Sequence, residues 1–270
     1  MNKTKLIFTM MLILASRMVQ VNAQSMFLAL EGEEWKEVKD YPVKGKQGLL
    51  VKEKLSFGDY RTLDVDRSWT KGSEVTTGLT VGVPTDDFYK KIITTDKIHK
   101  KQTLFFALGD SHGNQSTTYS VSQLDAKDFN IGNSDVSVFN LLLDLAGPGA
   151  KSSNVSYSRI YVGPSAEGWD LFIDNQAAVA QPKKYMGYLA KNDTEFYTIT
   201  PVTKVKNKKG KVGAMPFGSV GFEIRSKDGE ALAAVSVIDN GIIYLKETDP
   251  QEQLLLASAC AALLLRPEDL

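Results

Sequence analysis

Two residues of metal-ligand type occur close together in the stretch G-D-S-H-G-N at positions 109–114. Asp110 and His112 follow the apolar run Leu104–Leu108, which has the composition of a β-strand. A carboxylate and an imidazole at this spacing can bind one metal ion, which can activate water and stabilise phosphate oxygens. The alternative interpretation is a polar hairpin loop in which the Asp and Asn side chains bond to backbone groups.

The D-x-H-G-N order resembles the first metal-binding motif of calcineurin-like metallophosphatases. The resemblance implies a two-metal centre in which Asp110 and His112 bind one of the metals. Such a centre needs further His and Asn ligands downstream, but His99 is the only other histidine, and neither G-D-x-x-D nor G-N-H follows. We therefore expect no metal or other cofactor, and keep a metal-dependent phosphoesterase as an alternative function.

A second chemical feature is the segment K-V-K-N-K-K-G-K at positions 204–211. Strand alternation places Lys204 and Lys206 on one face, with Lys208, Lys209 and Lys211 around the following turn. Ammonium groups attract phosphate, and each is worth about 1 kcal/mol at an anionic membrane surface. The alternative is a solvated hairpin whose lysines prevent edge-to-edge strand pairing. These five lysines are the candidate ligand-binding residues of the chain.

The elements that would position these groups include one with unusual apolar density, near the C-terminus. Asp249 can cap a helix that has Pro250 at its first position, and Glu252 can reach back to the cap residue. The twelve residues Leu254–Leu265 carry no charge, and Ser258 is the only conventional polar group among them. Its hydroxyl can bond the carbonyl four residues earlier, so it can be buried.

A helix over 250–265 has no polar face, so it must be enclosed either by protein or by lipid. A membrane span needs about 20 apolar residues, which favours enclosure by protein. Six small residues at 257–262 separate two leucine triplets, so the surrounding wall should come closest at the middle of the helix. The single cysteine, Cys260, lies there and excludes an internal disulfide; we expect it to be a packing residue.

Residues 1–23 have the pattern of a secretory signal peptide. Lys3 and Lys5 precede the apolar run Leu6–Ala15, and Val21–Ala23 resembles a cleavage site. We therefore expect export to the periplasm or the exterior. Without this segment the chain has 29 basic and 32 acidic residues, which argues against nucleic-acid binding by overall charge.

Between Trp35 and Tyr244, short runs rich in β-branched and aromatic residues alternate with turn residues, indicating a mainly β fold. The expected strands include 60–69, 74–83, 88–94, 136–145 and 196–206. Charged and apolar residues alternate along 60–69, which indicates either a strand with one wet face or the rim of a ligand site. A β-sandwich would leave the apolar helix on a surface, whereas a closed barrel buries it on every side and removes the sheet edges. We expect residues 24–270 to form one domain, a closed antiparallel β-barrel wrapped around a C-terminal α-helix. The glycine-rich segment 147–153 leaves open a division into two β-rich lobes.

The region 229–270 places a hairpin directly before the capped apolar helix. An Asn240-Gly241 turn of type I′ is expected to pair Ala233–Ile238 with Ile242–Leu245. This arrangement resembles the end of tubby-like domains, the group that includes the tubby C-terminal domain, LURP-one-related proteins and phospholipid scramblases. The resemblance implies a twelve-strand barrel around a central hydrophobic helix and contact with membrane phospholipid. It assigns no ligand residue in this chain.

Three functional hypotheses follow from these features. The leading one is an exported, non-enzymatic domain that binds phospholipid or another anionic or amphipathic ligand, with a membrane surface as its partner. The second is an envelope-associated structural or interaction protein without a small ligand. The third is the phosphoesterase that would use Asp110 and His112. The first is preferred because the sequence holds a lysine cluster but no complete set of catalytic residues.

Overall fold

The structure is a computed structural model that describes residues 26–36, 38–46, 54–69, 102–124, 154–165, 167–215 and 218–266. The predicted signal peptide at 1–23 lies outside the described residues. So do the strands expected at 74–83, 88–94 and 136–145, and the glycine-rich segment 147–153.

The described part of the chain is dominated by β-strands, with a few helical segments. The strands are β1 (Met26–Leu28), β2 (Lys39–Pro42), β3 (Ser56–Phe57), β4 (Tyr60–Trp69), β5 (Gln102–Gly109), β6 (Gln115–Leu124), β7 (Val155–Val162), β8 (Trp169–Asp174), β9 (Gly187–Ala190), β10 (Phe196–Val202), β11 (Lys204–Asn207), β12 (Val212–Ala214), β13 (Gly221–Ser226), β14 (Ala231–Ser236) and β15 (Ile242–Leu245). The helical segments are the 3-10 helix η1 (Glu33–Trp35) and the α-helices α4 (Asn175–Ala180) and α5 (Pro250–Leu265).

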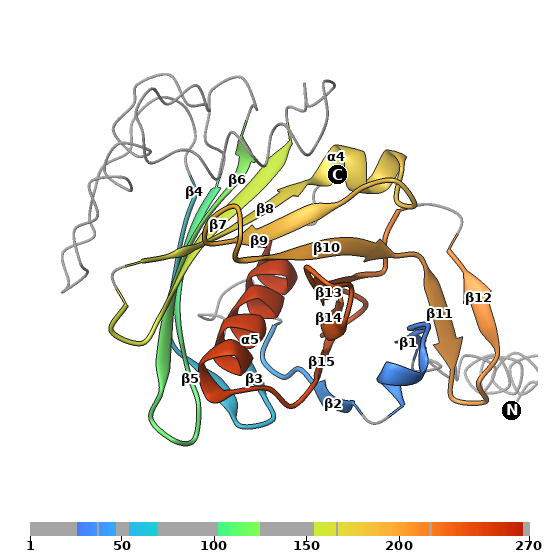
Figure 1. The fold of residues 1–270 in the computed structure, drawn as a ribbon, viewed down its shortest axis with the longest axis horizontal. Coiled ribbons are helices and arrows are strands. Elements are labelled where there is room, and N and C mark those ends of the chain that lie inside the picture. The colour runs from blue at the N-terminus through green and yellow to red at the C-terminus, as the bar shows by residue number, and fades with distance from the viewer. Residues whose placement is uncertain are drawn as a thin grey trace, which may run out of the picture.

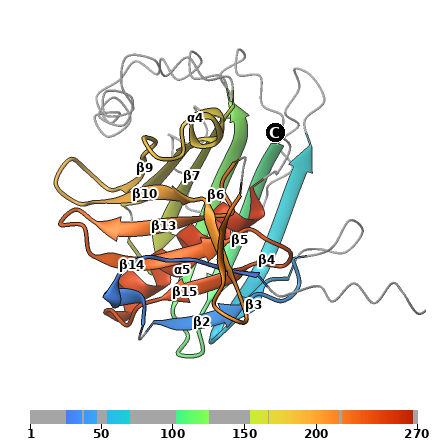
Figure 2. The ribbon, with the colours of Figure 1, turned by 90° about the vertical axis from the view of Figure 1, so that its right-hand side faces the viewer.

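Twelve of the strands form one antiparallel sheet in the order β2-β15-β14-β13-β10-β9-β8-β7-β6-β5-β4-β3. The sheet curls until its two ends nearly meet (Figures 1 and 2). A bridge between Lys44, just after β2, and Ser56 in β3 joins the ends through two backbone hydrogen bonds of 3.0 Å each. This nearly closed barrel confirms the mainly β, antiparallel barrel predicted from the sequence.

Helix α5 runs through the barrel, with β4–β7 on one side and β13–β15 on the other (Figure 1). From Leu254 to Leu265 no residue is more than 4% exposed to solvent, so enclosure of the predicted apolar segment is confirmed. The carboxylate of Asp249 accepts hydrogen bonds from the backbone N–H groups of Gln251 and Glu252, as expected of an N-cap. The Glu252 carboxylate, which was expected to reach back to the cap, is bonded to Tyr197 at 2.7 Å.

Polar contacts fix the helix to the barrel wall. Ser258 donates to the Leu254 carbonyl (2.7 Å), as predicted, and its hydroxyl lies 2.6 Å from that of Ser116 on β6. Arg67 on β4 donates a hydrogen bond to the Leu265 carbonyl at 2.9 Å. A carbonyl in the last turn, which has no partner within the helix, is thus satisfied by a cation. The charge alternation of β4 suggested a wet strand face or a ligand rim, but Arg67 is a helix-capping residue.

The wall is lined by small side chains where α5 approaches it. On β6, alternate positions carry Ser116, Thr118, Ser120 and Ser122, all buried, and β6 and β7 both contact the helix. On the opposite side α5 contacts β14, which contributes Ala233 to the same core. Small residues on both surfaces allow the backbones to approach closely, as the run of small residues in α5 predicted.

A second, three-stranded sheet in the order β1-β11-β12 packs against the outside of the barrel at β14 and β15 (Figure 1). Its inner face contributes Leu28 and Val205 to a small core that includes Ala234 of β14 and Tyr244 of β15. The strand predicted over 196–206 is therefore wrong in one respect, because it breaks at Thr203 into two strands that join different sheets. The molecule is layered here, with α5 inside, the barrel wall next and the small sheet outermost.

Two further local features differ from the sequence analysis. Helix α4 was not predicted, and Asp174 caps it by accepting a hydrogen bond from the Ala177 N–H. The β14–β15 hairpin has the predicted partners, but its connection spans 237–241 and is not a two-residue type I′ turn. Asp239 and Gly241 have positive φ there, and a Cβ on Gly241 would lie 2.6 Å from a methyl of Leu264, so the turn is shaped by the helix packed against it.

Candidate functional site

The five candidate lysines all lie on the β11–β12 hairpin. Lys204 and Lys206 are in β11, and the other three occupy the turn that leads to β12. Asn207 builds this turn: its side-chain oxygen accepts hydrogen bonds from the N–H groups of Lys209 and Lys211. Gly210 has a φ of +77°, a conformation that glycine adopts without steric cost. The sequence thus folds locally into a tight turn surrounded by ammonium groups.

We call β1, β11 and β12 together the lysine sheet. Residues directly opposite one another in neighbouring strands share a face, and Val205 is buried opposite Leu28. The other face therefore carries the row Phe27, Lys206 and Val212, one residue from each strand, with Lys204 opposite Ala214 beside it. This outer face combines ammonium groups with apolar side chains.

The lysine sheet and the residue that follows it hold three exposed large apolar side chains. Val212 is 55% exposed and lies on the outer face, whereas Met26, 41% exposed, lies opposite Asn207 on the face of Leu28. Met215, also 41% exposed, follows the end of β12. The outer face thus carries Val212 and the partly buried Phe27 beside lysines, which makes it amphipathic.

One of the five lysines is neutralised within the protein. Lys204 lies 2.5 Å from the Glu31 carboxylate, and the hydrogen bond from Lys204 lowers the pKa of Glu31. Within the described ranges, no carboxylate pairs with Lys206, Lys208, Lys209 or Lys211. Four ammonium groups thus face solvent without a partner of opposite charge from the described residues, so the outer face attracts anions.

The loop containing Asp110 and His112 is the β5–β6 hairpin, as the alternative interpretation proposed. One Asp110 carboxylate oxygen accepts hydrogen bonds from the N–H groups of His112 and Asn114, and the other accepts from the Asn114 side chain. Desolvation raises the pKa of Asp110, but these hydrogen bonds outweigh it and hold the pKa below its usual value. Both oxygens therefore stabilise the loop, and the His112 ring is 79% exposed beside it.

Cys260 is fully buried in the middle of α5, with its sulfur 3.9 Å from the Ala234 carbonyl. Burial raises the pKa of this thiol, so it stays protonated. The packing role expected of Cys260 agrees with this environment. In the part of the chain that the structure describes, no group of three or more His, Cys, Asp or Glu side chains is arranged to hold a metal ion.

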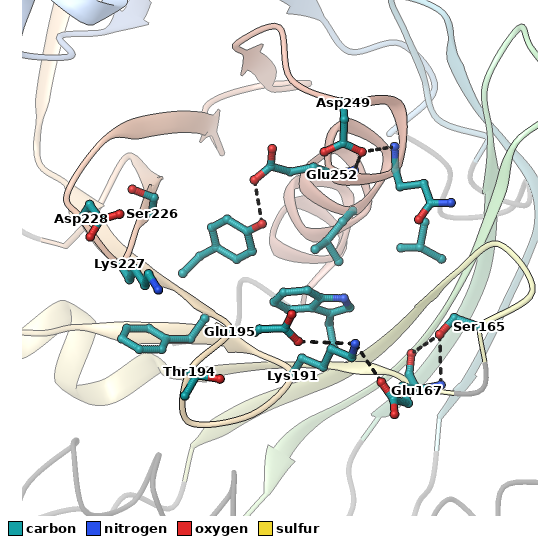
Figure 3. A pocket seen from close by; sticks show the side chains of 16 residues that line it. Ser165, Glu167, Lys191, Thr194, Glu195, Ser226, Lys227, Asp228, Asp249 and Glu252 are labelled. Carbon is teal, nitrogen blue, oxygen red and sulfur yellow. Dashed lines mark hydrogen bonds and ion pairs between the residues drawn. The ribbon is translucent and has the colours of Figure 1, made fainter.

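Sequence reasoning missed a pocket of about 510 Å³ at the barrel end where α5 enters (Figure 3). It is lined by the first turn of α5, the start of β8, the β9–β10 and β13–β14 turns, and the segment after β7. These segments are far apart in sequence, so no local pattern could indicate that their side chains converge. Asp249 and Glu252 were recognised only as helix-start residues.

Comparison of this chain with protein-family models, curated proteins and solved structures gives no match. Neither α-helix of the described residues has both the length and the apolarity that a membrane span would require.

Proposed function

We propose that this protein is a non-enzymatic domain that binds anionic phospholipid surfaces through the lysine sheet. One observation carries the proposal: four lysines without an ion pair from the described residues lie on the β11–β12 hairpin, and the outer face of the same sheet carries the exposed Val212 and the partly buried Phe27. Lysines attract lipid phosphates, while apolar side chains can enter the headgroup region, and stable attachment generally needs both contributions.

The placement of the lysine sheet supports this function mechanically. It packs on the outside of β14 and β15 through its inner face, and among the described residues Lys204, Lys206, Val212 and Ala214 of its outer face are exposed. The barrel and its enclosed helix provide a rigid support, since their core does not depend on the lysines. Contact with a membrane would therefore require little rearrangement of the fold.

The architecture also supports the proposed kinship with tubby-like domains. A twelve-strand sheet around an enclosed C-terminal helix is the arrangement that the resemblance implies, and phospholipid contact is the functional theme of that group. The expected export of the chain would bring the lysine sheet to an envelope or extracellular membrane surface.

Co-sedimentation with vesicles tests the proposal. The protein should bind vesicles containing phosphatidylserine or phosphatidylglycerol far better than vesicles of phosphatidylcholine alone, and salt should weaken this binding. A variant with glutamine at Lys206, Lys208, Lys209 and Lys211 should lose affinity by up to roughly 4 kcal/mol, taking about 1 kcal/mol per lysine. The matched control replaces four exposed lysines elsewhere, namely Lys44, Lys54, Lys183 and Lys184.

If the hairpin variant and the control variant lose vesicle binding equally, binding depends only on the overall charge of the protein, and the proposed site is rejected. Val212→Thr and Met215→Gln test the apolar contribution separately. Salt does not screen apolar insertion, so these variants should be compared at high ionic strength, where their deficit should be clearest. Binding that ignores headgroup charge would contradict the proposal as a whole.

A further inference from the structure

The pocket at the entry of α5 has a chemistry opposite to that of the lysine sheet. Five carboxylates line it, belonging to Glu167, Glu195, Asp228, Asp249 and Glu252. Only two lysines, Lys191 and Lys227, accompany them, so the lining has a formal charge of −3. A concave site focuses the field of such charges and raises the local concentration of cations.

An aromatic wall completes the pocket. Trp169 of β8 and Tyr197 of β10 both line it, with ring centroids 5.4 Å apart, and Phe196, whose ring packs on that of Tyr188, is a third aromatic lining residue. All three are only partly buried, so each retains surface that solvent or a ligand can reach. Aromatic faces attract cations, most strongly ammonium groups that are poorly hydrated.

Hydrogen bonds and ion pairs inside the pocket hold its carboxylates in place. Tyr197 donates to Glu252 at 2.7 Å, and burial, followed by this bond, raises the pKa of Tyr197, so the phenol keeps its proton. The bond orients the Glu252 carboxylate beside the aromatic wall. On the opposite side Lys191 lies 2.8 Å from Glu167 and 3.4 Å from Glu195, so one ammonium is shared between two carboxylates (Figure 3).

We propose that this pocket binds a small organic cation through an ammonium group, held between the Trp169–Tyr197 wall and the carboxylates of Glu252 and Glu195. The volume of about 510 Å³ lies in the range of small-molecule pockets. An anionic ligand is disfavoured by the charge of the lining, and a neutral apolar ligand would leave its formal charge of −3 uncompensated. The site is separate from the lysine sheet and does not depend on the proposed function.

Choline and its neutral isostere, 3,3-dimethylbutan-1-ol, are the probes that separate cation recognition from simple filling of a cavity. Titration of the full chain, followed by calorimetry or by NMR of the ligand, should show saturable choline binding and at least tenfold weaker binding of the isostere. Vesicles of phosphatidylcholine form a second arm, because the same ammonium occurs on a lipid headgroup. Binding of choline but not of these vesicles would identify a soluble ligand as the source.

Three substitutions in the pocket and one control locate the binding. Glu252→Gln keeps the acceptor for Tyr197 but removes the charge, and should weaken choline binding about tenfold. Trp169→Leu keeps an apolar side chain without a π face, and should weaken it about fivefold. If this variant fails to fold, Glu195→Gln, which removes the second carboxylate proposed to hold the ammonium group, should also weaken choline binding. Glu33→Gln, which removes an exposed carboxylate outside the pocket, should leave choline binding unchanged.

Several outcomes would overturn the proposal. Equal affinity for choline and the neutral isostere would make the pocket a simple apolar cavity. Choline binding that survives the Glu252, Glu195 and Trp169 substitutions would place the ligand elsewhere. Absence of binding at millimolar choline would reject an ammonium site. Because the lysine-sheet variant should bind choline normally, failure here is distinguishable from failure of the lipid-binding function.

Discussion

The barrel interior and the lysine sheet are built on opposite principles. From Leu254 to Leu265 of α5 every side chain is buried, none is charged, and the one polar side chain, Ser258, is hydrogen-bonded. On the lysine sheet, by contrast, Lys206, Lys208, Lys209 and Lys211 are exposed and lie within six residues of one another. We therefore expect the interior to stabilise the fold and the lysines to contribute little to it.

This contrast predicts that stability and vesicle binding can be altered separately in this molecule. A substitution at the interior should change the free energy of unfolding and leave vesicle affinity of the folded protein intact. A substitution of the exposed lysines should do the reverse. Each of the following experiments measures both quantities, so that the separation itself is tested.

The largest effect is expected from Ala259→Leu in the middle of α5. Ala259 is completely buried in the run of small residues of α5, so three added carbons should overpack the interior and lower the free energy of unfolding by about 1–3 kcal/mol. Chemical denaturation measures this loss. The matched control is Ala214→Leu on the exposed face of β12, which should stay within about 0.5 kcal/mol. Equal stability of both variants would contradict the tight fit of the helix.

A smaller effect is expected from Ser258→Ala. The change removes the hydroxyl that lies 2.6 Å from that of Ser116 and should cost about 1 kcal/mol, since the buried Ser116 hydroxyl loses its partner. Adding Ser116→Ala should recover part of the loss, because both polar groups are then absent. A double-mutant cycle from denaturant midpoints measures this coupling. Strictly additive losses would show that the two serines do not interact.

The smallest effect on stability is expected from glutamine at Lys206, Lys208, Lys209 and Lys211. Removal of four mutually repelling, solvent-exposed charges should change the free energy of unfolding by about 0.5 kcal/mol or less. Thermal or denaturant unfolding in vesicle-free buffer provides the measurement. Marked destabilisation would mean that the lysines serve the fold, and the contrast between the two regions would then fail.

Much of this architecture could be predicted because its signals are local. The bounds of α5, its cap at Asp249 and the back-bonding of Ser258 follow from neighbouring residues, and an all-apolar helix admits few environments besides a closed sheet. The break at Thr203 and the role of Arg67 were not predicted, because each depends on a distant partner. Thr203 separates strands that pair with different sheets, and Arg67 bonds a carbonyl 198 positions away.

The candidate sites show the same division. The lysine cluster could be found in the sequence because five like charges occur within eight residues, but its apolar neighbours Met26 and Phe27 come from a strand far upstream. The pocket could not be found, since Trp169, Tyr197 and Glu252 meet only after the barrel forms. Sequence patterns thus indicated what could attract an anion, but not where side chains from separate turns would surround a cation.

The pairing of β2 with β15 has a consequence for the order in which the molecule is completed. Pro42 pairs with Ile242, so the partner of β2, the first strand of the large sheet in the sequence, is synthesised about two hundred residues later. Until the segment 242–265 is available, the sheet is an open, curved strip with a bare apolar inner wall. The segment 242–265 supplies both the missing strand and the helix that fills the barrel. A chain truncated before it would therefore expose apolar surface, and truncation at this end should resemble a general folding defect.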